Sequence, residues 1–160
     1  MPKVSAGLLV YRRDDDGDVE VLLVHPGGPL WKKKDEGAWS IPKGEVEGEA
    51  DQAATADREF AEELGSPAPA GVRLDLGQIT QRSGKLVRAW AVAGDLDVDS
   101  VRSNNFDMEW PRGSGQIRSF PEVDRAAWFT PEVARSKLVE AQTAFLDRLA
   151  LALADDDGRT

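Results

Sequence analysis

The chain has 160 residues, of which 41% are hydrophobic and 31% charged; it contains no cysteine and carries a formal net charge of −9. This length and composition predict one globular domain, and they exclude disulfides, thiolate zinc sites and cysteine nucleophiles. The negative charge argues against a nucleic-acid polymer or an anionic membrane as a partner, and the apolar runs are too short for a membrane span.

The first predicted elements form a β-hairpin. Residues 4–12 and 19–25 are aliphatic and β-branched, and the sequence DDDGD between them favours a tight turn. A loop rich in Pro and Gly follows, carries three consecutive lysines, and leads into the strand-like segment WSIP. His25, the single histidine, ends the second strand and is expected to be structural. One histidine argues against Ser-His-Asp catalysis and against a His-rich metal site.

The clearest predicted helix covers residues 50–64. Ala53, Ala56, Phe60 and Leu64 recur every three or four residues and form a narrow apolar stripe. A glycine and then a proline follow, in the order that is typical of a helix C-terminus.

Three further strands are expected after this helix. Residues 72–81 and 85–96 predict two strands around the turn RSGK, and residues 123–129 predict a short one. Residues 104–119 are polar and interrupted by Pro and Gly, so we expect a long loop there, and such loops are often functional.

A single C-terminal helix is predicted over residues 131–154, with an apolar stripe made of Leu138, Ala141, Phe145, Leu149 and Ala152. We see no internal repeat and no linker. The economical interpretation is one α+β domain over residues 1–154, followed by a frayed tail at residues 155–160. The start of the chain lacks a signal-peptide pattern, so we expect a cytoplasmic protein, either a monomer or a homodimer.

Three glutamates converge near the end of the predicted middle helix. Glu59, Glu62 and Glu63 stand at i, i+3 and i+4, so their carboxylates share one side of the helix, where they repel one another and the helix dipole. Carboxylate oxygens suit Mg²⁺ or Mn²⁺, and Arg58 is spaced to hold Glu62 by a salt bridge. The alternative is an ordinary solvated acidic surface.

The segment GEVEGEADQAATADREFAEELGS, residues 44–66, resembles the Nudix box, the signature G-x5-E-x7-R-E-U-x-E-E-x-G-U of Nudix hydrolases, where U is a bulky apolar residue. The positions that match without a gap are Gly44, Arg58, Glu59, Phe60, Glu62, Glu63 and Gly65. Two positions depart from it. Ala50 stands where the first box glutamate is expected, with Glu49 adjacent, and Ser66 replaces an apolar residue.

The resemblance implies the fold, the metal and its ligands. It implies a Nudix-type α/β/α sandwich around a mixed β-sheet, in which Mg²⁺ or Mn²⁺ is held by Glu59, Glu62, Glu63 and the carbonyl of Gly44. A carboxylate from a later loop often completes this set in the family. Glu122 is the first choice, Glu109 the second with Asp107 behind it, and the general base would be Glu63 or Glu122.

The lead-in WSIPKG resembles that of Nudix enzymes that cleave diadenosine polyphosphates. The implied substrate is a small nucleotide, a dinucleoside polyphosphate or a nucleoside triphosphate, and the residues expected to bind it are Lys43, Lys32, Arg88 and Trp39. For most cationic side chains here the plain alternative is surface solubility, and Lys43, beside the box, is the one we favour.

Three functions remain open from the sequence. The leading hypothesis is a metal-dependent pyrophosphohydrolase that cleaves a phosphoanhydride bond with water. The second is a nucleotide-binding sensor without turnover, motivated by Ala50. The third is an acidic interaction domain without metal.

Overall fold

The computed structural model describes residues 3–157, with the side chains of residues 156 and 157 left aside. Its strands are β1 (Val4–Arg13), β2 (Val19–Pro26), β3 (Lys43–Glu45), β4 (Leu74–Thr80), β5 (Leu86–Ala93), β6 (Asn105–Glu109), β7 (Ile117–Pro121) and β8 (Val123–Phe129). Its helices are α1 (Gln52–Leu64), α2 (Pro131–Lys137) and α3 (Thr143–Asp157), with 3-10 turns η1 (Val98–Ser100) and η2 (Glu140–Gln142). The strands predicted at residues 4–12, 19–25, 72–81, 85–96 and 123–129 are confirmed as β1, β2, β4, β5 and β8, with ends shifted by a few residues.

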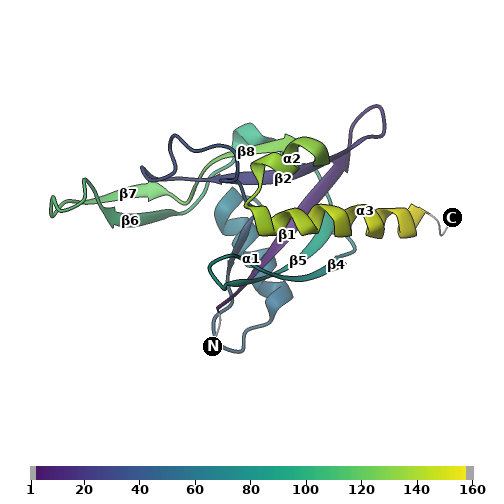
Figure 1. Ribbon diagram of the computed structural model, residues 1–160, viewed down its shortest axis with the longest axis horizontal. Coiled ribbons are helices and arrows are strands. Elements are labelled where there is room, and N and C mark those ends of the chain that lie inside the picture. Colours follow the sequence, from purple (N-terminus) through teal and green to yellow (C-terminus); the bar gives the residue numbers. More distant parts are fainter. Residues whose placement is uncertain (1–2, 158–160) are drawn as a thin grey trace.

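A mixed sheet forms the centre of the molecule, with the order β4-β5-β1-β2-β8, and β3 also pairs with β1. β1 runs parallel to β5 and antiparallel to β2 and β3. α1 covers one face and α2 and α3 the other (Figure 1). The predicted α/β/α sandwich is therefore confirmed.

Both faces of β1 are covered, which explains its nearly continuous apolar run. Leu8 and Val10 pack with Phe60 of α1 on one face, while Leu9 packs with Phe145 of α3 on the other. This double burial fixes the register of the central strand, because a slip of one residue would exchange the two sets.

α1 begins at Gln52, two residues later than residue 50. The side chain of Asp51 caps it by accepting a hydrogen bond of 3.0 Å from the N–H of Ala54. It ends at Gly65, whose φ of 72° is left-handed and whose N–H donates to the carbonyl of Ala61 at 2.8 Å. Ala50 therefore lies in the exposed loop before the helix.

The loop expected at residues 104–119 is instead a β-hairpin of β6 and β7, which projects from the body of the molecule (Figure 1). Phe106 faces Phe120 across it, with ring centroids 6.1 Å apart. The expectation was wrong because Phe106, which alternates with polar residues in β6, gains its apolar partner Phe120 only once the strands pair, and the Pro and Gly of the turn suggested a loop.

The single helix expected at residues 131–154 is broken after Lys137. Leu138 is extended, with a ψ of 148°, and the N–H of Val139 donates to the carbonyl of Trp39 at 2.9 Å. This pairing with a distant segment draws the backbone out of the helix. α3 then continues to Asp157, beyond residue 154, so residues 155–157 of the expected tail are helical, while residues 158–160 lie outside the described residues.

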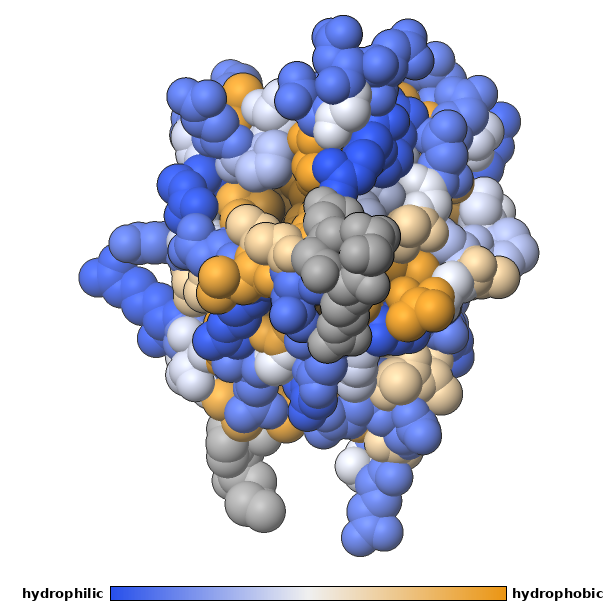
Figure 2. Space-filling view, turned by 90° about the vertical axis from the view of Figure 1, so that its right-hand side faces the viewer, coloured by the Kyte–Doolittle hydropathy of each residue, from blue (hydrophilic) through white to orange (hydrophobic). Residues whose placement is uncertain are grey.

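The face around the C-terminal end of α3 is largely hydrophilic, with hydrophobic groups in separate spots (Figure 2). Within residues 3–157, no helix is both long and apolar enough to cross a membrane.

Candidate active site

Gly44 in β3 lies directly against Glu59 of α1. A Cβ added at Gly44 would stand 1.9 Å from the carboxyl carbon of Glu59, which is closer than any real contact. Only glycine therefore leaves room for this carboxylate beside the backbone of β3. The two box residues are brought together as expected.

Arg58 bridges two of the predicted ligands. Its Nη1 lies 3.1 Å from Oε1 of Glu62 and 3.4 Å from Oε1 of Glu59. The arginine thus holds the outer carboxylates of the cluster and offsets part of their repulsion.

Glu63 is the buried member of the cluster. Its Oε1 accepts a hydrogen bond of 3.2 Å from the backbone N–H of Lys43, and burial raises the pKa of Glu63 to about 8. The pKa of Glu59 is also raised, by burial and by the charge of Glu62.

Glu122 joins this group from the β7–β8 junction. A small cavity of about 140 Å³ is lined by Lys43, Glu63 and Glu122, together with residues of β2. Burial and the charge of Glu62 raise the pKa of Glu122. The first-choice carboxylate is therefore placed beside the box helix.

Backbone hydrogen bonds tie Glu122 to the end of α1. The N–H of Asn104 donates to the carbonyl of Glu62 at 3.0 Å, and the N–H of Glu122 donates to the carbonyl of Asn104 at 2.8 Å. On the other side, the N–H of Gly27 donates to the carbonyl of Glu122 at 2.9 Å. These backbone hydrogen bonds fix the position of Glu122 relative to the end of α1.

Glu109 and Asp107, the second choices, lie on the projecting hairpin. Oε1 of Glu109 accepts a hydrogen bond of 2.7 Å from the N–H of Gly113 in the hairpin turn. Glu109 is thus engaged within the hairpin, and neither residue lines the cavity that holds Glu63 and Glu122.

The donor set fits a hard divalent ion, because it consists of carboxylates and a carbonyl next to a glycine that admits close approach. In the described part of the chain, no cationic side chain forms a salt bridge with Glu63, whose carboxyl is buried and whose pKa is raised. Among residues 3–157, no three acidic, His or Cys side chains are already arranged to hold a metal ion. Ion binding would therefore require these side chains to turn, and Arg58 to release them.

The four predicted substrate residues are placed differently. Lys43 is half-buried in the small cavity. Its pKa is lowered chiefly by burial and then by the positive charge of Lys85. Lys32 is exposed in its loop. Arg88, in β5, is paired with Asp75 and lies over a tryptophan ring. Of these, only Lys43 is gathered with Glu63 and Glu122.

Trp39 is only 3% exposed, and its surroundings leave no ring face for a base. The edges of His25 and Phe129 contact it, with centroids 5.2 and 5.1 Å away, and the guanidinium of Arg125 lies 5.1 Å from its centroid. The expectation that Trp39 itself binds substrate by stacking conflicts with this packing. His25, also fully buried, is structural as expected.

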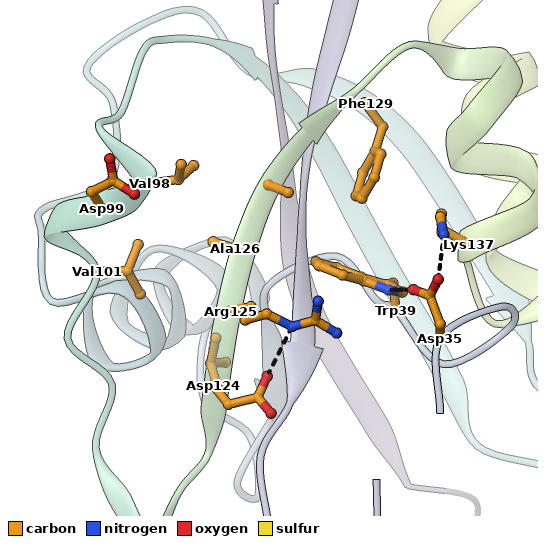
Figure 3. A pocket seen from close by; sticks show the side chains of 12 residues that line it. Asp35, Trp39, Val98, Asp99, Val101, Asp124, Arg125, Ala126, Phe129 and Lys137 are labelled. Carbon is orange, nitrogen blue, oxygen red and sulfur yellow. Dashed lines mark hydrogen bonds and ion pairs between the residues drawn. The ribbon is translucent and has the colours of Figure 1, made fainter. Parts of the chain in front are cut away.

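A larger cavity of about 610 Å³ lies at the edge of β8 and was not predicted from the sequence (Figure 3). Its walls include Asp35, Trp39, Val101, Asp124, Arg125 and Phe129. Val123 lines both this cavity and the small one, so the two adjoin. Glu47, in the loop before α1, was not predicted from the sequence either. After burial and the charge of Glu62, its charge also raises the pKa of Glu59.

Comparisons with known proteins agree with this geometry. The family model described as NUDIX domain matches residues 1–149. Among solved structures, the chain is similar to a C. elegans Ap4A hydrolase in a binary complex, with 22% identity, a TM-score of 0.67, and coverage of 96% of this chain and 98% of that one.

Two further structures show the same fold. A mutT/nudix family protein from Listeria innocua is 16% identical with a TM-score of 0.65, covering 100% of this chain and 99% of that one. The NUDIX domain of Shewanella oneidensis NrtR, complexed with ADP ribose, is 15% identical with a TM-score of 0.57, and the match covers 100% of this chain and 90% of that one. No curated protein matches the chain.

Proposed function

The chain belongs to the Nudix family, and from this premise we propose that it is a Nudix hydrolase that uses Mg²⁺ or Mn²⁺ to cleave a phosphoanhydride bond of a nucleoside polyphosphate with water. The observation that carries the proposal is the meeting of Glu63 and Glu122 in one cavity at the end of the box helix. We include a cytoplasmic location in the proposal, since the cysteine-free chain needs no oxidising compartment.

The ion would be held by Glu59, Glu62, Glu63, Glu122 and the carbonyl of Gly44. When bound, it supplies positive charge that neutralises phosphate oxygens and lowers the pKa of water. The carboxylate of Glu122 is the group we assign to accept the proton of the attacking water, because it lines the cavity and is less buried than Glu63. Lys43, in the same cavity, would bind and orient a phosphate oxygen.

A dinucleoside polyphosphate is our preferred substrate class. Two features support it: the WSIPKG lead-in, which in the structure runs from the large cavity at Trp39 to the small one at Lys43, and the similarity to an Ap4A hydrolase. A nucleoside triphosphate remains the other member of the proposed class.

The test is hydrolysis of a panel of dinucleoside polyphosphates and nucleoside triphosphates, with and without Mg²⁺ or Mn²⁺. We expect metal-dependent cleavage, and a loss of at least about a hundredfold in Glu62→Gln and Glu63→Gln. Glu132→Gln, an exposed glutamate in the first turn of α2, is the matched control and should retain activity. Full activity in EDTA, or in both cluster variants, would refute the proposal.

Nucleotide binding without turnover is the second candidate function, and Ala50 favours it. The loop before α1 is exposed at both Glu49 and Ala50, so neither is packed into the cluster. Calorimetry that shows nucleotide binding, together with no cleavage across the whole panel, would select this candidate.

A further inference from the structure

We propose that Arg125, supported by Trp39, is the platform on which the nucleobase of the substrate stacks, in the large cavity at the edge of β8. The proposal rests on the proposed function and adds to it where the nucleoside lies and which residue recognises its base. In this arrangement the phosphates occupy the small cavity of Glu63 and Glu122, and the nucleoside occupies the large one.

At two places in the sequence, neighbouring residues line the two different cavities. Ser40 lines the small cavity and Trp39 the large one, while Glu122 lines the small cavity and Asp124 the large one, with Val123 in both. The large cavity therefore begins one residue after Glu122 along the chain. About 610 Å³ is within the range of small-molecule sites and admits a nucleoside.

The charges of the large cavity fit a nucleoside and disfavour a phosphate. Asp35, Asp99 and Asp124 line it. Lys137, one of its two cations, is held by Asp35 and by Glu36, the latter at 2.9 Å, so its charge is already compensated. The walls therefore repel anions and offer acceptors to the hydroxyl and amino donors of a nucleoside.

Arg125 supplies the flat surface that the aromatic rings do not. Its side chain is 56% exposed, its guanidinium lies over the ring of Trp39, and its Nε is 3.9 Å from Oδ1 of Asp124 (Figure 3). The ring of Trp39 lies below the guanidinium, and Oδ1 of Asp124, which is hydrogen-bonded to Nδ1 of His25 at 2.8 Å, places a negative charge beside it. Nucleobases stack on such arginine planes.

Apolar side chains close the other side of the cavity. Val98 and Val101, from η1 and the residue after it, lie with Ala126 on the face of β8 opposite to Arg125 and Trp39 (Figure 3). The base would therefore stack on the Trp39 face of β8, where Asp35 and Asp124 also line the cavity and offer acceptors to its polar groups.

The experiment compares two ligands that share a phosphate and a ribose. AMP and ribose 5-phosphate are titrated by calorimetry against the protein in Mg²⁺, and because neither ligand contains a phosphoanhydride bond, binding is measured without turnover. For the wild-type protein we expect AMP to bind at least about tenfold more tightly, as one stacked base provides. Equal affinities would overturn the proposal without any variant being needed.

Variants then assign the base contact to Arg125. We expect Arg125→Ala and Arg125→Lys both to weaken AMP binding by about tenfold, because lysine keeps the charge and loses the plane. Arg118→Ala, an exposed arginine on β7, is the matched control and should bind AMP as the wild type does. AMP affinity that is unchanged in Arg125→Ala, or restored in Arg125→Lys, would contradict stacking.

These outcomes are separate from the test of hydrolysis. A protein that binds AMP through Arg125 and cleaves nothing would retain this inference and lose the proposed activity. A protein that cleaves nucleotides while AMP and ribose 5-phosphate bind equally would retain the activity and lose the inference.

Discussion

The carboxyl group of Glu59 lies against the backbone of Gly44, in the space that a side chain at residue 44 would fill. Gly44→Ala should therefore displace the carboxyl end of Glu59, a flexible side chain, at little cost in the free energy of unfolding. We expect at least a tenfold loss of activity and a smaller rise in melting temperature with Mn²⁺.

Gly17→Ala is the control for this substitution. Gly17 has a φ of 84° in the β1–β2 turn and open space around it, so alanine there strains the backbone and leaves the site intact. An equal loss of the Mn²⁺ response in both variants would mean that only general stability was measured.

The box helix was the element best predicted from the sequence, because its apolar stripe and its glycine stop are local signals; its start was placed two residues early because the cap at Asp51 was not recognised. The break at Leu138 has a different origin. It depends on the hydrogen bond from the N–H of Val139 to Trp39, which lies a hundred residues earlier in the chain and leaves no mark in the helical pattern. The β6–β7 hairpin was missed for the same kind of reason, since Phe106 and Phe120 become neighbours only once the strands pair.

The buried carboxyl of Glu63 predicts a pH dependence of stability in the metal-free protein. Its pKa is about 8 in the folded state and near the usual 4.5 when unfolded, so between these values the folded state binds more protons. The free energy of unfolding should therefore fall as the pH rises from about 5 to 8.5. Each unit of pKa difference contributes about 1.4 kcal/mol.

Urea unfolding in EDTA at several pH values measures this effect. Glu63→Gln keeps the size of the side chain and remains neutral throughout, so it should lose much of the decline. Identical pH slopes for the wild type and this variant would show that Glu63 ionises normally.

Ser103 is expected to position Glu122. Its Oγ accepts a hydrogen bond of 3.1 Å from the N–H of Val123, next to Glu122. Ser103→Ala leaves this N–H without its partner and should cost about 1–3 kcal/mol of stability. If Ser103 also positions Glu122, kcat should fall at temperatures where the variant is fully folded, and Ser103→Thr should restore it.

Ser119→Ala, on the exposed strand β7, serves as the control. A Ser103→Ala protein with lower stability and normal kcat would limit Ser103 to a structural role.

Replacing either Glu122 or Glu109 by glutamine shows which of the two carboxylates takes part in catalysis. Glu122→Gln should lower kcat by at least a hundredfold if Glu122 accepts the proton, whereas Glu109→Gln should remain within about twofold of the wild type. Glu109 ends β6 beside the hairpin turn, whereas Glu122 follows β7 at the base of the hairpin, and of the two only Glu122 lines the cavity with Glu63. The reverse result would assign the role to the projecting hairpin.

The part of the candidate site that lies within one continuous motif could be proposed from the sequence, and the roles of its residues stay predictions. Gly44, Arg58 and Glu59 lie within one motif, and their contacts follow from a loop packed on a helix. The large cavity was not predictable in this way, because Arg125 and Val101 reach it from segments that meet only at the sheet edge. Trp39 illustrates the limit most clearly: its type suggested a base contact, but the ring is 3% exposed and lies 5.1 Å from the guanidinium of Arg125, to which we assign that contact in our proposal.

The central claim is that the carboxylates at the end of α1 hold a divalent ion. Its most direct test is a crystal structure of the protein soaked with Mn²⁺, with anomalous scattering recorded to locate the ion. The account predicts an anomalous peak within about 2.5 Å of oxygen atoms of Glu59, Glu62 or Glu63. Well-ordered crystals that show no peak beside these three side chains, even with a nucleotide present, would contradict it.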